Sequence, residues 1–185
     1  MPAQAAQDRT PRLSHYPPGE ADGALLKAIG RFRSAIWRDR ASQMAPSDED
    51  SGWLEAADHH SHLWLVTGAD GTLIATARLS LSWDLAHLPE RELYADLEAE
   101  LAPPFATMGR LAVAPAWRRQ GIAEQLIRAR LSKAEALGAN SILLDCPEHR
   151  VLAMQKHGFK ALKEPQAGVL YPEMTFVVMG KFATA

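Results

Sequence analysis

Residues 111 to 123 read LAVAPAWRRQGIA, and this stretch predicts a strand, a loop and the start of a helix. The apolar run ends at Val113, and Pro115 prevents the strand from extending its ladder of hydrogen bonds. A helix begins after the loop, at residue 119 or 120, and its first backbone N–H groups have no partners within the helix. Gly121 has no side chain, so a ligand can approach the main chain closely there.

This helix start predicts an anion site. The positive end of the helix dipole points into the space before the helix, and Arg118 and Arg119 add fixed positive charge. Hydrogen bonds to charged groups contribute about 1.5–3 kcal/mol each, so three or four of them could hold a pyrophosphate. The alternative is a plain turn in which Gly121 serves packing alone, but the run Arg-Arg-Gln-Gly exceeds what a turn requires. The common phosphate motifs GxxxxGK[ST] and GxGxxG are absent.

Outward from this stretch, the chain predicts an α/β fold with a mixed sheet flanked by helices. Apolar residues at helical spacing predict helices over 22–36, 89–101, 121–137 and 148–157, and a capped helix start at 47–50 leading into Trp53. Strands are expected at 62–67, 72–81, 105–113, 141–145, 159–162 and 174–179, the first two as a hairpin. Residues 1–20, with four prolines, are expected to form a flexible tail with one short strand at 12–16. Residues 21–185 are expected to form a single domain.

Composition excludes several classes of protein. The 185 residues are 47% hydrophobic and carry a net charge of -2, which is typical of a globular protein and gives no reason to expect nucleic-acid binding. No apolar run reaches the roughly 18 residues of a membrane span. The first twenty residues lack the apolar segment of a secretory signal, so a cytoplasmic location is expected. The single cysteine, Cys146, excludes an intramolecular disulfide and a multi-cysteine zinc site.

The string VAPAWRRQGIA resembles the signature of the GNAT superfamily of acyl-CoA-dependent N-acyltransferases, whose core is [QR]-x-x-G-x-[GA]. Here that core runs from Arg118 to Ala123. The string MQKHGF, Met154 to Phe159, resembles the second landmark of the family, a helix that ends in Gly-Phe. The separation of Gly121 and Gly158 is typical of the family.

The resemblance implies where acetyl-CoA or another acyl-CoA would bind as co-substrate. The pyrophosphate would lie on backbone N–H groups at the helix start, and the pantetheine arm would pair with the preceding strand like an added strand. In this family that strand carries a bulge and splays from the next one, and an N–H near Val113 would polarise the thioester carbonyl. The donor-binding residues implied are Leu111, Ala112, Val113, Arg118, Arg119, Gln120, Gly121, Ile122 and Ala123.

The catalytic residues of the family do not carry over to this sequence. Many members use a carboxylate upstream of the LAV segment, but residues 106–108 are Ala-Thr-Met. The usual general acid is a Tyr, and its position holds Met154. Tyr171, His149, Cys146 or a water chain could substitute, although Cys146 at a strand end is typical of a buried apolar residue.

Two arginines on adjacent expected strands, Arg78 and Arg110, could clamp the carboxylate of an amino-acid-like acceptor. The alternative is that both face solvent. The strings TARLSL and GRLAV also resemble acyl-homoserine-lactone synthases, although the acidic residue of that family would fall on Thr107. The run Asp58 to His62 contains three histidines, but alternate residues of an extended chain face opposite sides, so a solvated hairpin edge is expected rather than a metal site.

These observations predict an enzyme that moves an acetyl or other short acyl group from acyl-CoA to a primary amine of a small molecule, by direct attack on the thioester. One alternative is a non-catalytic domain that binds or senses acyl-CoA. The other is a long-chain N-acyltransferase of the lactone-synthase type. No nucleic acid, membrane or metal is expected as a partner, and a homodimer is left open.

Overall fold

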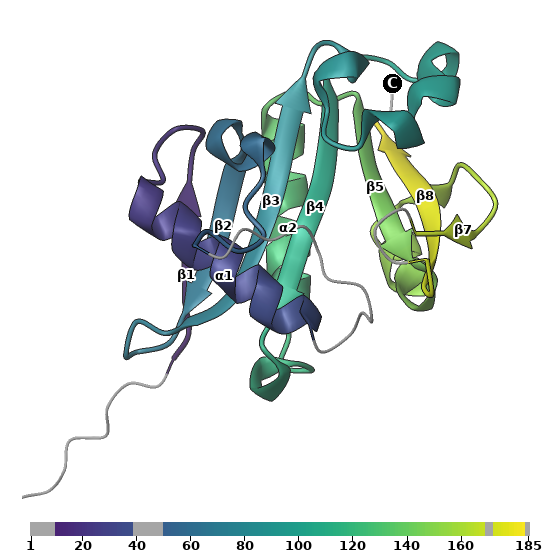
Figure 1. Cartoon of the computed structure of the whole chain (residues 1–185). Helices are drawn as coiled ribbons and strands as arrows, with labels where there is room; N and C mark the ends of the chain where they lie inside the picture. The colour runs from purple at the N-terminus through teal and green to yellow at the C-terminus, as the bar shows by residue number, and fades with distance from the viewer. Residues whose placement is uncertain (1–9, 39–49, 169–171, 184–185) are drawn as a thin grey trace, which may run out of the picture.

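The computed structural model describes residues 10–38, 50–168 and 172–183. Its centre is a sheet in the order β1-β2-β3-β4-β5-β8-β6, with β7 paired to β8 beside this path (Figure 1). The strands are β1 Arg12–Tyr16, β2 His62–Thr67, β3 Leu73–Ser82, β4 Phe105–Val113, β5 Ser141–Pro147, β6 Lys160–Ala161, β7 Gln166–Ala167 and β8 Thr175–Phe182. Among the strands that the structure describes, β4 and β5 run parallel and the other pairs are antiparallel.

Helices cover both faces of this sheet. Helix α1, Gly23–Arg38, lies on the front face in Figure 1, and α2, Ile122–Ala136, lies behind β3 and β4. Because side chains alternate along a strand, each strand supplies both faces. In β5, Ile142, Leu144 and Cys146 pack in the cluster that contains the apolar side of α2, whereas Leu143 packs in a cluster on the front face. Among the described segments, no helix combines the length and apolarity needed to cross a bilayer.

Most expected elements are confirmed, including the α/β class with a mixed sheet. The strand expected at 12–16 is present as β1 and pairs along its whole length with β2, so part of the expected tail belongs to the sheet. The helix expected over 148–157 is shorter: a 3-10 turn at Glu148–Arg150 and α3, Val151–Gln155.

One expected helix is wrong, and another begins outside the described residues. Over 89–101 the structure has short 3-10 turns at Arg91–Leu93 and Ala95–Glu100. The φ of 61° at Glu90 excludes a helix start at residue 89, and Tyr94, with a φ of -117°, separates the two turns. Residues 47–49 lie outside the described part of the chain. Trp53 is not helical, and it follows Gly52, whose φ is 64°.

The sheet divides between β4 and β5. These strands pair only through Phe105–Ser141, Ala106–Ile142 and Thr107–Leu143, after which they diverge while β5 stays paired to β8 (Figure 1). On its other edge β4 carries a bulge. Thr76 pairs with Ala112 but Arg78 with Gly109, so two β4 residues oppose one β3 residue. Arg110 in the bulge has a φ of 54°. The expected bulge and splay are both confirmed.

Candidate donor and acceptor site

The start of α2 lies directly after the end of the diverging strand β4, across the 3-10 turn Pro115–Trp117. Gly121 is the N-cap with a φ of 80°, and a β-carbon placed there would meet nothing within 4 Å. In the described chain, no group accepts a hydrogen bond from the amides of residues 121 to 124, the ordinary orphans of a helix start. The predicted cradle is therefore open, with its amide hydrogens available to an anion.

Two side chains of the predicted site are turned back onto the main chain. Arg118 donates from Nε to the Val113 carbonyl at 3.0 Å, and Gln120 donates from Nε2 to the Ala116 carbonyl at 3.0 Å. The amide of Arg118 is also engaged, at 3.3 Å from the Pro115 carbonyl. These contacts close the loop between β4 and α2 and leave residues 119 to 124 as the free amides.

The main chain near Val113 faces the divergence of the strands. The amide of Ala114 donates to the Ile74 carbonyl of the β2–β3 hairpin at 2.8 Å, so it points toward β3. Successive peptide groups of a strand point to opposite edges, so the amide of Val113 points toward the side where β5 has moved away. That is the position implied for an N–H that polarises a thioester carbonyl.

The front face above β3 and β4 holds a network of buried charges. The carboxylate of Glu55 accepts hydrogen bonds from Arg110 Nε at 2.7 Å and Nη2 at 2.5 Å, and from Arg78 Nη1 at 2.7 Å. Asp58 accepts from Arg33 of α1 at 2.7 Å and from Arg78 at 3.2 Å. Arg110 also pairs with Glu90 at 2.6 Å.

The segment that carries Glu55 is held against α1 by a close backbone approach. The amide of Trp53 donates to the Gly30 carbonyl at 3.0 Å, and a β-carbon at Gly30 would lie 2.0 Å from the Ser51 carbonyl oxygen. Only glycine permits that approach. The indole of Trp53 then packs under Arg110, whose guanidinium carbon lies 4.8 Å from the ring centre.

The network fixes the ionisation of its members. Burial alone would raise the pKa of Glu55, but hydrogen bonds and charge from Arg110, with the charge of Arg78, outweigh burial and hold the pKa at about 2. Burial likewise opposes ionisation of Asp58, whose pKa is nevertheless lowered by Arg33 and Arg78. Arg110 has its pKa raised by Glu90 and Glu55 despite burial.

One acidic residue nearby behaves differently. Asp145 of β5 has its pKa raised to about 6, first by burial and then by the charge of Glu90, with Arg110 acting in the opposite direction. Its Oδ1 is buried without a hydrogen-bond partner among the described residues, and so is the hydroxyl of Tyr94. Burial, Glu90 and Asp145 together raise the pKa of Tyr94, so this hydroxyl stays neutral.

The structure places the other candidates apart from this region or outside the described residues. His149 is exposed in a 3-10 turn, and Tyr171 lies in a segment that the structure does not describe. Met154 is 4% exposed within the core. Cys146 is buried as expected, and burial raises the pKa of its thiol to about 11.

The expectation of a solvated edge over Asp58 to His62 is wrong in part. Asp58 and His62 are buried, one in the charge network and the other beside His15, while His59 and His60 are exposed. Across ranges 10–38, 50–168 and 172–183, no three His, Cys, Asp or Glu side chains are grouped so that they could hold a metal ion.

Arg78 and Arg110 do lie on neighbouring strands, but the solvent-facing alternative is wrong. Arg78 is 2% exposed, and both guanidinium groups are paired with carboxylates of the chain itself. Sequence reasoning missed two of those carboxylates, Glu55 and Glu90, and also the nearby Asp145, which pairs with neither arginine. The available signal was a charged residue, Asp145, at the end of the otherwise apolar string SILLD.

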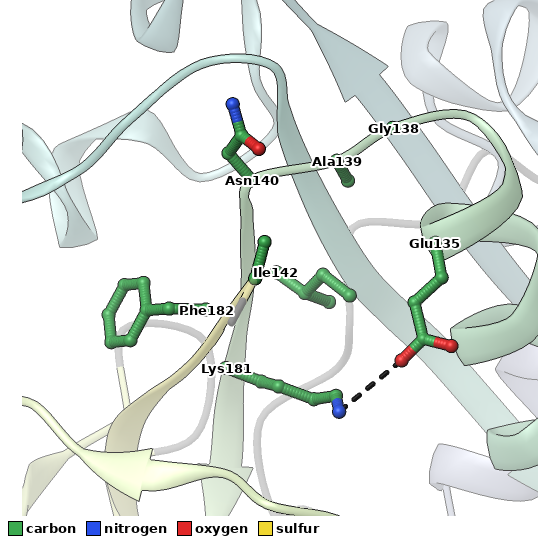
Figure 2. A pocket seen from close by; sticks show the side chains of 8 residues that line it. Glu135, Gly138, Ala139, Asn140, Ile142, Lys181 and Phe182 are labelled. Atoms are coloured by element: carbon green, nitrogen blue, oxygen red, sulfur yellow. Dashed lines mark ion pairs between the residues drawn. The ribbon is translucent and has the colours of Figure 1, made fainter. Parts of the chain in front are cut away.

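A separate hollow of about 280 Å³ lies at the opposite end of α2, between that helix and the end of β8 (Figure 2). Lys181 and Glu135 form an ion pair of 3.3 Å beside it. The lining residues are Glu135, Gly138, Ala139, Asn140, Ile142, Lys181, Phe182 and Ala183. None of them belongs to the donor or acceptor residues described above.

An open mixed sheet that splits beside the start of a helix defines an acyltransferase-like fold. The model of the Acetyltransferase (GNAT) family matches residues 28–159. The chain belongs to this family, whose members use acyl-CoA as co-substrate.

Solved structures share the fold at low sequence identity. An acyl-CoA N-acyltransferase from Pseudomonas aeruginosa is 20% identical with a TM-score of 0.65, over 93% of this chain and 99% of that one. The AHL synthase LasI is 13% identical with a TM-score of 0.71, over 96% and 92%. FeeM, an N-acyl amino acid synthase from uncultured soil microbes, is 12% identical with a TM-score of 0.69, over 94% and 92%. A search of curated proteins finds no match.

Proposed function

We propose that this protein transfers an acetyl or other short acyl group from acyl-CoA to a primary amine of a small molecule. The observation that carries the proposal is the divergence of β4 from β5 directly before the unpartnered amides at Gly121 to Glu124. A thioester carrier with a diphosphate needs both features: an anion cradle and an extended slot that leads away from it.

The donor side of the proposed reaction uses main chain and fixed charge. The pyrophosphate accepts hydrogen bonds from amides of residues 119 to 124, and the side chain of Arg119 adds positive charge. The pantetheine arm pairs with β4 where β5 has moved away. An amide of β4 between the bulge and Val113 donates to the thioester oxygen and stabilises the negative charge that develops there when the amine attacks.

The acceptor side is proposed to lie on the front face, bordered by Arg110 and Glu90. Because Glu55, Asp58 and Glu90 already neutralise the two strand arginines, we assign Arg78 and Arg110 the role of holding these carboxylates in position. A carboxylate on the acceptor is then not required, and simple amines should serve as well as amino acids.

The test is acceptor-dependent release of CoA thiol from acetyl-CoA, measured across a panel of primary alkyl amines, diamines and amino acids. Release with at least one amine supports the proposal, and thiol release without an amine does not count. Tight CoA binding with no acceptor-dependent release would contradict it and favour an acyl-CoA sensor. A parallel series with decanoyl-CoA identifies a long-chain enzyme if only that donor is used.

A further inference from the structure

The charge network on the front face is balanced without Asp145. Three guanidinium groups, those of Arg33, Arg78 and Arg110, pair with three carboxylates within 4.0 Å. Those carboxylates belong to Glu55, Asp58 and Glu90. Asp145 is a fourth carboxylate on the same face, and none of the described cations forms an ion pair with it. A half-buried carboxylate without a counter-ion is costly unless a cation arrives from outside the chain.

Asp145 lies beside the bulge of β4, at the closed end of the divergence, and a pantetheine arm that enters from the start of α2 would run along β4 toward this end. The parallel register of β4 and β5 ends at Thr107–Leu143, and two further residues along each strand bring Asp145 level with Gly109, next to the bulge. Leu143, two residues earlier in β5, packs on the front face, and alternation puts Asp145 on that face too. Its carboxylate therefore lies on β5, across the divergence from the bulge of β4.

The surroundings of Asp145 are polar but incompletely satisfied. Asp145 Oδ1 and the Tyr94 hydroxyl are both buried without a partner in the described residues. Tyr94 packs with Leu143 and Val178, and Val178 is the β8 partner of Asp145. Buried polar atoms are nearly always paired in folded proteins. Two unsatisfied polar atoms on this face leave hydrogen-bonding capacity that a polar group of a ligand could use.

We propose that Asp145 is the catalytic base, and that the acceptor is a primary amine that binds as its ammonium ion against this carboxylate. This inference rests on the proposed function. The carboxylate takes one proton from the ammonium, and the freed lone pair forms the N–C bond to the thioester carbonyl carbon. The C–S bond then breaks, the thiolate leaves with the bonding electrons, and the second amine proton returns to it through solvent.

The groups facing Asp145 support such a role. Burial and Glu90 favour the protonated form, Arg110 opposes it, and Tyr94 is neutral, while Cys146 points to the other face. A base with a pKa of about 6 holds a proton about a hundredfold better than an ordinary aspartate, and it is still ionised at pH 7. These are the properties of a general base matched to neutral pH.

The experiment compares wild type with Asp145→Asn, using the best acceptor found in the amine panel. The exposed Asp84→Asn serves as the control for a carboxylate-to-amide change. Asp145→Asn should lower kcat/KM for the amine by about a hundredfold or more and leave the Kd for CoA unchanged. Wild-type kcat/KM should rise with pH to a plateau above about 6. The variant should instead climb continuously toward the pKa of the amine, because only the free base reacts.

The thermal stability of Asp145→Asn distinguishes a catalytic role of Asp145 from a structural one. A raised carboxyl pKa destabilises the folded state at pH 7, so Asp145→Asn should raise Tm while it abolishes most activity. Two results would overturn the inference and leave the proposed function intact. One is a wild-type kcat/KM for Asp145→Asn, and the other is a wild-type pH profile of kcat/KM that shows no change near pH 6. Absence of amine-dependent CoA release from wild type would overturn the proposed function and the inference together.

Discussion

Glu55 and Arg110 form a two-point ion pair, with Nε and Nη2 of the arginine 2.7 and 2.5 Å from the two carboxylate oxygens. The pair joins the segment after α1 to the bulge of β4, residues 55 positions apart in the chain. The pair thereby fixes the front face to β4, the strand that would bind the donor. A substitution on the front face should therefore also affect the position of β4.

Replacing Glu55 with Gln should destabilise the fold. The change removes one of the two carboxylates that each of Arg110 and the buried Arg78 contacts, and breaking a buried pair costs about 3 kcal/mol at the low end. Urea unfolding at pH 7 measures the loss, with the exposed Glu92→Gln as control. The low pKa of Glu55 stabilises the fold above pH 4.5, and this contribution is lost as pH falls toward 2. Equal stability of Glu55→Gln and wild type would show that the pair contributes nothing.

A glutamate at Gly121 should abolish CoA binding, because it places bulk and negative charge in the cradle. Gly138 at the other end of α2 offers a matched control. Its φ of 74° is close to the 80° of Gly121, and both have open space where a β-carbon would be. Calorimetric titration with CoA should show at least a hundredfold weaker binding for Gly121→Glu and unchanged binding for Gly138→Glu. Equal CoA affinities of the two variants would show that the pyrophosphate of CoA does not bind at the start of α2.

The histidine pair on β1 and β2 should make stability fall in mild acid. His15 Nε2 lies 3.0 Å from His62 Nδ1, and burial, His15 and Lys133 lower the pKa of His62 to about 4. This histidine must stay neutral in the fold, so its contribution is lost as pH falls from 6.5 through 4.

His62→Gln should therefore flatten the pH dependence of the unfolding free energy over this range, by on the order of 2 kcal/mol. Urea unfolding at steps between pH 7 and 4 measures the difference. Asp145 acts in the opposite direction over part of the range, but this contribution cancels between variant and wild type. Parallel curves for the two proteins would exclude the histidine pair as the cause.

The bulge of β4 should depend on Arg130 of α2. This buried side chain donates from Nη1 to the carbonyls of Arg78 at 3.3 Å and Gly109 at 3.2 Å, and burial lowers its pKa to about 9. Arg130→Met removes both of these hydrogen bonds and should cost about 2 kcal/mol of unfolding free energy. Hydrogen exchange should also quicken in β4. Arg128→Met, on the exposed side of the same helix, should change neither measurement.

The sequence predicted the donor side more completely than the acceptor side, for a physical reason. The strand at 105–113 and the helix after Gly121 follow from local periodicity, a proline and a glycine, all within twenty residues. Glu55, Arg78, Arg110 and Glu90 meet only through the tertiary fold, and no local pattern records such distant contacts. The wrong helix over 89–101 shows the same limit, because Leu93, Leu97 and Leu101 have α-helical spacing but pack into the core from short 3-10 turns and the residue that follows them.

The divergence of β4 and β5 makes the proposed donor slot insensitive to side-chain substitution. Its walls are peptide groups held in register by neighbouring strands, and exchanging one side chain for another barely alters their spacing. The opposite rim includes irregular turns after Glu90, whose exposed side chains tolerate exchange far better. Directed evolution toward other nucleophiles should therefore accumulate its changes at exposed positions of residues 84–101, while the carrier that delivers the acyl group stays the same.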